Sequence, residues 1–288
     1  MKVVLSRKGF DQGSGGAPSP LFADGSMFSI PIPDGRTLQR YGDMRHGEHD
    51  IGEVVTHLTR GHYSGRSFAH VDPDLERGRM PRIEGWRPAF GQTGAAQRHL
   101  QNQGVGPGDL FVFFGWFCDV SRGMDGRWRR TPGGRDIHAI HGWLQVDEVI
   151  DLSSGRTSDW GRYRWLCNHP HVNRGAEPNN TIYVAKERLE LPGHIGSGVD
   201  GGGRLSRLVD ANTLTASGQP MKSVWSLPDW FGPESGRTLS YHADPGRWST
   251  SPSGLNLRTV GRGQEFVIDV GNDERALRWV VDLISAAG

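Results

Sequence analysis

Histidine and aspartate alternate along residues 68–75, FAHVDPDL, in a spacing that suits chemistry. An extended backbone places His70, Asp72 and Asp74 on one side of the chain, because alternate side chains share a face. Pro73 favours that conformation for Asp72, since proline disfavours a helical residue before it. One imidazole and two carboxylates can hold a divalent cation or serve as acid and base. His70 and Asp72 are therefore candidate catalytic residues and all three are candidate metal ligands, with a turn capped by Asp72 as the alternative.

A second histidine pair, His169 and His171, alternates in the same way around Pro170. Two imidazoles on one face form half of a zinc or iron site, and a carboxylate from elsewhere must complete it. The alternative is that both rings hydrogen-bond to the backbone as structural histidines. His138 and His141 diverge on a strand, so we predict packing or hydrogen-bonding roles for them. The cofactor stays open, and a divalent metal is one that these patterns allow.

The first twenty residues, MKVVLSRKGFDQGSGGAPSP, lead from a short β-prone run into a polar, glycine-rich loop. Glycines let backbone N–H groups approach a ligand closely, and neighbouring cations suit phosphate. Neither GxxxxGK[ST] nor GxGxxG spacing is present, so this is not a standard phosphate-binding motif. An exposed turn after an edge strand is the alternative. The candidate phosphate-binding residues are Ser6, Arg7, Lys8, Ser14, Gly15 and Gly16, and Asp11 is a candidate catalytic carboxylate.

Two further segments place polar side chains beside predicted regular structure. Gln92 and Thr93 open a predicted helix, where unpaired N–H groups and the positive end of the dipole favour an anion, although Thr93 can equally cap the helix. In GRGQEFVIDV, residues 261–270, Arg262, Gln264 and Glu265 precede an apolar strand. The Gln264 amide can bind a base edge, and Glu265 is a candidate catalytic residue because its carboxylate can accept a proton. A strand entry whose charges face solvent is the alternative.

Strand signals dominate the scaffold that must position these residues. The apolar run DLFVFFGWF predicts a buried strand over 110–117, which we expect to pair with residues 137–150 through a long hairpin. Residues 265–270 predict a further strand. Helices are predicted over 92–103, and near the C-terminus, where Asn272 or Asp273 caps an apolar stripe. The glycine-rich segment 193–222 predicts a surface loop, with a mobile lid as the alternative.

Composition limits the class of protein. The 288 residues include 42 glycines and 17 prolines, and the formal net charge is +1. Such a composition favours many turns and short elements, here in one domain spanning residues 1–288, and gives no global field to recruit nucleic acid. The two cysteines exclude a disulfide framework, and no apolar run reaches membrane-spanning length. We therefore expect a soluble, cytoplasmic protein that has no membrane partner.

Distinctive short sequence motifs are spread along the chain from the first residues to the last predicted strand. They include LSRKGFD, SIPIPDGR, FAHVDPDL, GWRPAFGQTGAAQRHL, GVGPGDLFVFFGWF, HAIHGWLQVDEVI, NHPHV and VGRGQEFVIDV. Together they resemble the family called nucleotide modification associated domain 3, over nearly the whole chain. The resemblance implies an association with modified-nucleotide and DNA-modification systems, whose other proteins are then expected partners. It carries no catalytic residue with it.

The sequence predicts an α+β fold: a twisted, mostly antiparallel mixed sheet with few helices and a strand-rich core reminiscent of PUA-like modules. We expect an intracellular protein of nucleotide or DNA-base modification that binds a nucleotide or nucleic acid, preferably an enzyme acting on a nucleotide or modified base. The alternatives are a non-catalytic reader that binds a modified base and a scaffold of a modification complex. For enzyme or reader, one cavity with an aromatic wall is expected to be bordered by Arg7, Asp11, His70, Asp72 and Gln264.

Overall fold

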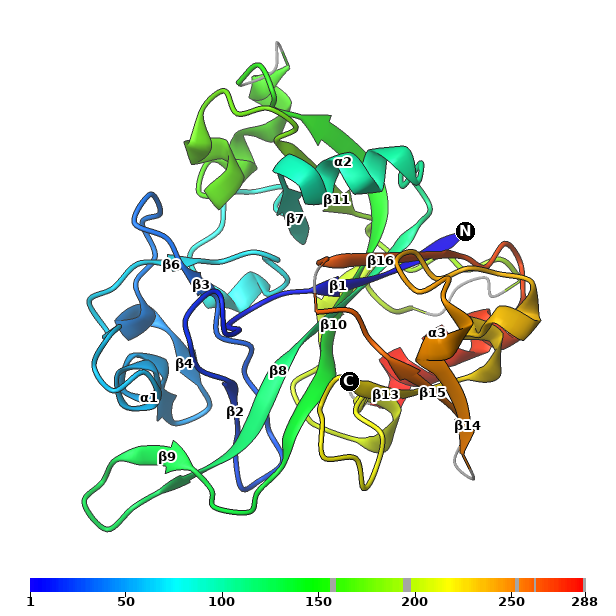
Figure 1. The fold of residues 1–288 in the computed structure, drawn as a ribbon. Helices are drawn as coiled ribbons and strands as arrows, with labels where there is room; N and C mark the ends of the chain where they lie inside the picture. The colour runs from blue at the N-terminus through cyan, green and yellow to red at the C-terminus, as the bar shows by residue number, and fades with distance from the viewer. Residues whose placement is uncertain (156–158, 194–197, 252–253, 262, 287–288) are drawn as a thin grey trace.

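The computed structural model of the chain describes residues 1–155, 159–193, 198–251, 254–261 and 263–286 (Figure 1). Sixteen strands and three α-helices alternate with long connections and short 3-10 turns within these residues. The helices are α1 (Ile51–Leu58), α2 (Gly94–Asn102) and α3 (Glu274–Ala286). The strands are β1 (Lys2–Arg7), β2 (Ser19–Leu21), β3 (Ile32–Pro33), β4 (Arg45–His46), β5 (His49–Asp50), β6 (Ala69–His70), β7 (Ala89–Gln92), β8 (Leu110–Arg122), β9 (Trp128–Arg130), β10 (Asp136–Asp151), β11 (Thr181–Ala185), β12 (Gly202–Arg204), β13 (Val224–Leu227), β14 (Trp248–Ser251), β15 (Gly254–Arg258) and β16 (Glu265–Asp269).

The main sheet has the order β16-β1-β8-β10-β11-β7, and β2, β9 and β12 add to β8 and β10. Its strand pairs are antiparallel except that β1 and β2 each run parallel to β8. The predicted α+β fold with a mostly antiparallel mixed sheet is therefore confirmed. No helix among the described residues has the length and apolar character needed to cross a membrane.

The long strands β8 and β10 form the centre of the sheet. Their register pairs Phe117 with Ile137 and Leu110 with Gln145, and it shifts near Ile140. Successive residues of β8 are buried from Leu110 to Cys118, because other elements cover both of its faces. The predicted pairing of 110–117 with 137–150 is confirmed. Strand β8 begins at Leu110 as predicted and extends beyond the predicted C-terminal end, and β10 extends by one residue at each end.

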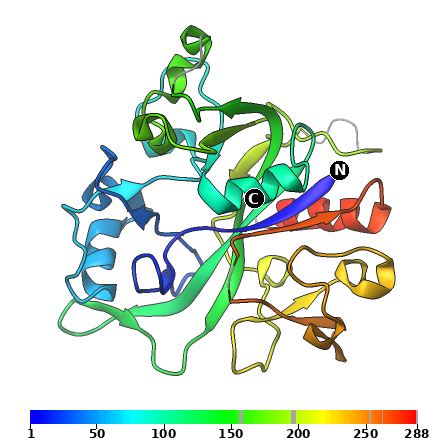
Figure 2. The same ribbon diagram turned by 45° about the horizontal axis from the view of Figure 1, so that its top comes forward.

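Three groups of elements surround these central strands in Figures 1 and 2. The first contains β2 to β6 with α1, the second contains α2, β7 and β11, and the third contains β13 to β15 with α3. The third group shares one apolar cluster with the main sheet, in which Trp225 and Leu277 pack with Leu5 and Phe114. The surrounding groups thus bury both faces of the sheet and bring distant segments together at its edges.

The C-terminal helix begins and packs as predicted. The Asp273 carbonyl accepts the Leu277 N–H at 3.0 Å, which places Asp273 at the helix start. Leu277, Val280 and Ile284 are buried against the sheet, and Val281 is partly buried. The apolar stripe therefore faces the core, next to strand β16.

Two predicted elements differ from the structure. Helix α2 begins at Gly94 rather than at Gln92, because Gln92 is the last residue of β7 and pairs with Thr181. The segment 193–222 contains β12, which pairs with β10, and it buries Leu205 and Leu214. Its glycines permit close packing on the sheet, so most of this segment is not a surface loop. Residues 194–197 lie outside the described residues.

Candidate metal centre

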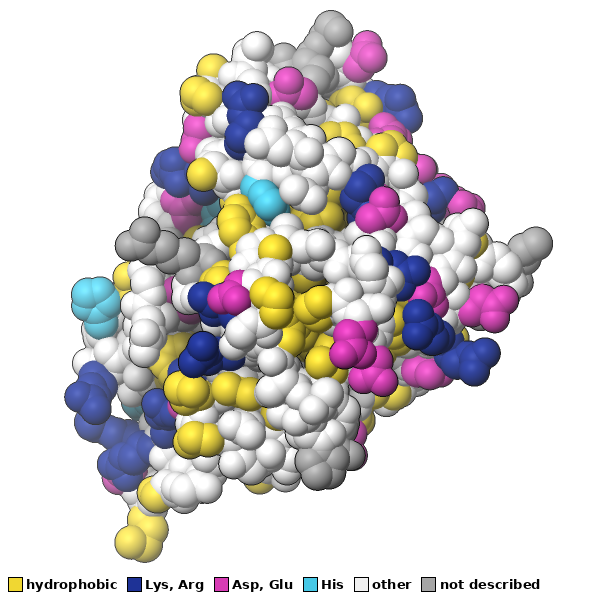
Figure 3. All heavy atoms as spheres, turned by 45° about the vertical axis from the view of Figure 1, so that its right-hand side comes forward, with side chains coloured by type: hydrophobic (Ala, Val, Ile, Leu, Met, Phe, Trp, Pro, Cys, Tyr) yellow, Lys and Arg dark blue, Asp and Glu magenta, His cyan; other side chains and the backbone are white. Residues whose placement is uncertain are grey.

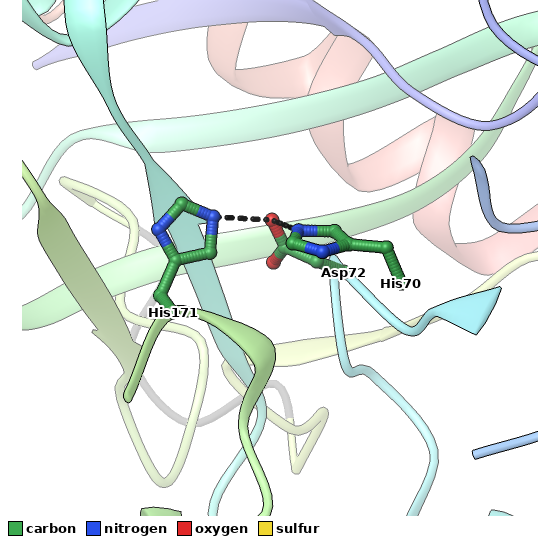
Figure 4. Close-up of side chains that lie close together, drawn as sticks. All are labelled: His70, Asp72 and His171. Carbon is green, nitrogen blue, oxygen red and sulfur yellow. Dashed lines mark ion pairs between the residues drawn. The ribbon is translucent and has the colours of Figure 1, made fainter. Parts of the chain in front are cut away.

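Segments that are distant in sequence meet at Asp72 (Figure 4). His70 ends β6, and Asp72 follows it along the edge of β7, where its Oδ1 accepts the Gly91 N–H at 2.8 Å. His171 comes from a 3-10 helix, Pro170–Arg174, that packs on β7. A Cβ on Gly91 would lie 2.2 Å from Cδ2 of His171, so glycine is needed for this close approach. A strand edge and a short helix therefore position the cluster.

The Asp72 carboxylate is surrounded by three imidazole nitrogens. Its Oδ2 lies 3.5 Å from Nε2 of His171 and 3.7 Å from Nε2 of His70. Its Oδ1 lies 3.6 Å from Nε2 of His169. These separations are long for hydrogen bonds, and they suit two ligands that each lie about 2.1 Å from one metal ion. One atom from each of His70, Asp72 and His171 lies within 4.8 Å of the other two, so these three residues can hold a divalent metal.

Further partners determine which nitrogen of each ring is free. Nδ1 of His70 lies 2.9 Å from the Asp34 carboxylate, which can only accept, so Nδ1 carries the proton. Nδ1 of His171 lies 2.7 Å from Oδ1 of Asn180, and the Asn180 Nδ2 donates to the His171 carbonyl at 2.9 Å. Each neutral ring therefore directs an Nε2 lone pair toward Asp72. Such lone pairs and a carboxylate repel one another unless a cation or a proton lies among them.

Burial and charge set the protonation of these groups. Burial raises the pKa of Asp72, but interactions with the three imidazoles outweigh it and hold that pKa well below its usual range. Burial lowers the pKa of His70, but the Asp34 and Asp72 carboxylates overcome this effect and raise it. Burial keeps the pKa of His171 below its ordinary value. A divalent cation that binds here would displace a proton held by His70 between two carboxylates.

His169 is oriented differently from the other two imidazoles. Its Nδ1 accepts the backbone N–H of His171 at 3.3 Å, so the neutral ring carries its proton on Nε2. This Nε2 is buried and has no hydrogen-bond partner in the part of the chain that the structure describes. His169 therefore suits donation of a hydrogen bond to a group bound beside Asp72 better than it suits ligation of a metal.

The cluster is closed to solvent. The side chains of His70, Asp72 and His171 are at most 5% exposed. Asp34, which holds His70, also pairs with Nε of the exposed Arg36 at 3.0 Å and lies 4.0 Å from Nη2 of Arg174. A ligand larger than a metal ion must displace part of this covering layer to reach the centre.

Asp74 lies outside the cluster, although the alternating pattern grouped it with His70 and Asp72. Its two carboxylate oxygens accept from the Arg82 guanidinium, each at 2.6 Å, and Trp86 Nε1 lies 3.3 Å from one of them. The backbone of Asp74 also bonds Ala89 in β7. A bidentate arginine pair occupies this carboxylate, so it is not available as a ligand here.

The glycine-rich loop after β1 is organised by Asp11. Its Oδ1 accepts the N–H of Gly13 at 2.8 Å and of Ser14 at 2.7 Å, and its carbonyl accepts the N–H of Gly16 at 2.9 Å. Gly15 lies against an aromatic ring, where a Cβ would collide at 2.4 Å. These N–H groups are engaged within the loop, so they do not form an open cradle for phosphate.

Lys8 points inward and joins a buried polar cluster. Its Nζ donates to Oε1 of Glu265 at 2.8 Å, and Nε2 of Gln92 donates to the same oxygen at 2.5 Å. Glu265 is 1% exposed. Its Oε2 and the Oγ of the neighbouring Ser6 are buried without a hydrogen-bond partner among the described residues. Three predicted site segments therefore meet here, but on buried groups rather than at an open phosphate site.

Other predicted residues line two cavities. Arg7 and Asp11 border a cavity of 390 Å³ whose aromatic walls are Phe114, Trp116, Trp225 and Phe266. Thr93 and Gln264 border a second cavity of 630 Å³ together with Glu265, His99 and Tyr241. Oγ1 of Thr93 donates to Glu177 at 3.2 Å instead of capping α2. Arg262 lies outside the described residues.

The expected convergence on one cavity is therefore not seen. Arg7 and Asp11 border the first cavity, Gln264 borders the second, and His70 and Asp72 belong to the metal cluster.

Sequence reasoning also missed Asp34 and Asn180. Their only signal is that Asp34 follows the proline-rich IPIP and Asn180 directly precedes a strand, and neither position links them to a distant histidine.

Comparison with known proteins gives a family. Residues 2–269 match the family described as nucleotide modification associated domain 3. No curated protein and no solved structure matches the chain. The family match covers nearly the whole chain, whereas a PUA-like core has no support from a solved structure.

Proposed function

The chain belongs to the nucleotide modification associated domain 3 family, and from this premise we propose that it is a metal-dependent enzyme of nucleotide or DNA-base modification. His70, Asp72 and His171 hold the metal, and His169 donates a hydrogen bond to the reacting group. Two histidines and one carboxylate leave coordination positions open, as catalytic iron and zinc sites require.

The observation that carries this proposal is the fixed direction of the two Nε2 lone pairs. Asp34 and Asn180 each accept a hydrogen bond from the Nδ1–H of one ring, so both Nε2 lone pairs point toward one carboxylate. Metal-binding histidines in proteins usually have such a partner on the other nitrogen, because it fixes the tautomer and the ring orientation. Buried carboxylates that only balance charge do not need two imidazoles held in this way.

The chain's own groups have distinct roles in this proposal. Asp34 and Asn180 orient the ligands, and the Gly91 N–H holds the Asp72 carboxylate at the edge of β7. Burial excludes water and strengthens each electrostatic interaction with the reacting group. Displacement of the layer around Arg36 and Arg174 admits the substrate group.

Activity is tested by product analysis. Chelator-treated protein is reloaded with Fe²⁺, Zn²⁺ or Mn²⁺ and incubated with DNA or with nucleotides, and the nucleosides are analysed by liquid chromatography and mass spectrometry. Asp72→Asn should reduce product at least about a hundredfold, because the ligand charge is lost. Its amide oxygen can still accept the Gly91 N–H, so circular dichroism should remain unchanged.

The matched control is Asp282→Asn, which changes an exposed carboxylate on α3. It should leave product formation intact. Equal product from chelated protein, reloaded protein and the Asp72→Asn variant would show that the metal centre is not the reactive site.

A reader function is the second candidate, and the aromatic cavity favours it. Arg7 lines this cavity, and Lys222 lies 4.5 Å from the centre of the Trp116 ring. The four aromatic side chains are at most 8% exposed, so a base must displace neighbouring side chains before it can stack on a ring. A reader binds nucleoside monophosphates equally well with and without metal. Calorimetric titration of chelated protein tests this, and loss of binding in Arg7→Gln with no metal-dependent product favours the reader.

A further inference from the structure

Arginines line a groove between the end of α1 and strand β9. The groove has a volume of 670 Å³, and the other residues that line it include Thr56, Gly61 and Trp128. No aspartate or glutamate of the described chain is among its lining residues. The arginines that line it are Arg60, Arg127, Arg129 and Arg130, and His57 lies among them.

Two of these four arginines form ion pairs, and the other two form none with another described residue. Arg129 pairs with Asp125 at 2.5 Å, and Arg130 pairs with Asp136 at 3.0 Å. Arg60 and Arg127 are exposed, and neither forms an ion pair with another described residue. Lys and Arg side chains gather at the lower left of Figure 3, the side on which the β8–β9 hairpin projects in Figure 1. The groove is therefore locally basic although the whole chain is almost neutral.

The two walls of the groove are fixed to each other. The backbone N–H of Trp128 donates to Nδ1 of His57 at 3.2 Å. On the neighbouring strand, Arg122 donates to Glu53 of α1 at 2.8 Å and lies 5.8 Å from the centre of the Trp128 ring. These contacts fix the backbone of the two walls from which the arginines project before a ligand arrives, so binding loses less backbone entropy.

We propose that this groove binds the phosphodiester backbone of duplex DNA. Two exposed arginines, Arg60 and Arg127, form no ion pair with another described residue, and no carboxylate of the described chain lines the groove, which suits phosphate oxygens. Neutralisation of those phosphates releases counterions. Trp128 is 9% exposed, so the groove lacks the open indole face on which single strands stack. The hairpin beside it is a two-stranded ribbon, which the major groove of B-DNA admits and the narrow major groove of duplex RNA does not.

The test measures binding of a fluorescent DNA duplex by anisotropy over a series of salt concentrations, in EDTA. The chelator makes the result independent of the metal centre, so failure here and failure of the proposed activity are distinguishable. Arg60→Gln with Arg127→Gln should weaken binding about ten- to hundredfold near 0.1 M salt. It should also reduce the slope of log K against log salt by about two, one for each lost phosphate contact.

The control is Arg98→Gln with Arg278→Gln, which removes two exposed arginines from α2 and α3. This pair should leave the affinity within about twofold and the slope unchanged, since neither residue lines the groove. Competing probes are a single strand of DNA, duplex RNA and ATP, and each should bind more weakly than duplex DNA. An unchanged slope in the groove variant, an equal loss in the control pair, or tighter binding of any competitor overturns the proposal.

Discussion

Single hydrogen bonds decide what the buried imidazoles can do. The Asn180 amide accepts from Nδ1 of His171 and donates to the carbonyl of the same residue, so both its position and its orientation are fixed. The Asp34 carboxylate accepts from Nδ1 of His70 and so fixes the tautomer of that ring with a charged acceptor. These two partners, rather than the ligands alone, distinguish a metal centre from a chance group of buried histidines.

Asn180→Ala should weaken metal binding about ten- to hundredfold, because His171 loses the partner that holds its ring and tautomer. Asn180→Asp should recover most of the affinity, since its carboxylate still accepts from Nδ1. The measurement is competition for Co²⁺ or Zn²⁺ against a chromophoric chelator. Equal affinities in all three proteins would remove Asn180 from the centre, and a melting curve for each variant shows whether it is folded.

Strand β7 connects the fold to the site at the scale of elements. It pairs with β11 on one edge, and its other edge receives Asp72 and Asp74. Gly91 lets the ring of His171 lie directly on this strand. The position of the centre is therefore set by strand pairing and by the glycine at position 91, which has no side chain to exclude the ring.

Gly91→Ala should destabilise the protein by about 1–3 kcal/mol, because the added methyl overlaps the His171 ring. The same substitution should lower metal affinity, since the ring must move away from Asp72. Gly106→Ala is the control, because a Cβ there would meet no atom within 4 Å. Urea unfolding measures the stability of both variants, and competition against a chromophoric chelator measures their metal affinity. Similar unfolding midpoints for the two variants would contradict the close packing described for β7.

Local patterns predicted the central strands but only part of the site. The β8 and β10 segments and α3 follow from apolar runs and one cap, because burial alone determines them. His70, Asp72, His169 and His171 were predicted as candidates by alternation, but the grouping of Asp74 with them ignored the competing Arg82. The engagement of the first loop by Asp11, and the roles of Asp34 and Asn180, depend on contacts between distant segments that no local pattern contains.

At the scale of the whole molecule, other histidines are buried in the neutral form at places outside the metal cluster. Burial lowers the pKa of His141 to about 3, and the nearby Arg204 and Arg79 contribute in the same direction. The unfolded chain binds a proton at this residue below about pH 6.5, whereas the folded chain does not until about pH 3. The stability that His141 contributes is therefore present above pH 6.5 and is lost as the pH falls toward 3.

His141→Gln should reduce the slope of the unfolding free energy against pH by about one proton, or about 1.4 kcal/mol per pH unit, between pH 4 and 6. His62→Gln, at an exposed position, should leave the slope unchanged. Urea unfolding at several pH values gives both slopes. The comparison uses slopes, so a uniform loss of stability in the variant does not affect it. If His141→Gln keeps the wild-type slope, the residue is not the buried neutral group described here.

We propose above that His70, Asp72 and His171 together hold one divalent metal ion. Elemental analysis of protein purified without chelator, and again after reloading and dialysis, tests it most directly. We expect about one metal ion per chain in the wild type. We also expect a large loss of bound metal in a folded His171→Gln variant, with full retention in His62→Gln. A folded wild-type protein that contains no metal and takes up none, or a His171→Gln variant that retains the full amount, would show that these three residues are not a metal centre.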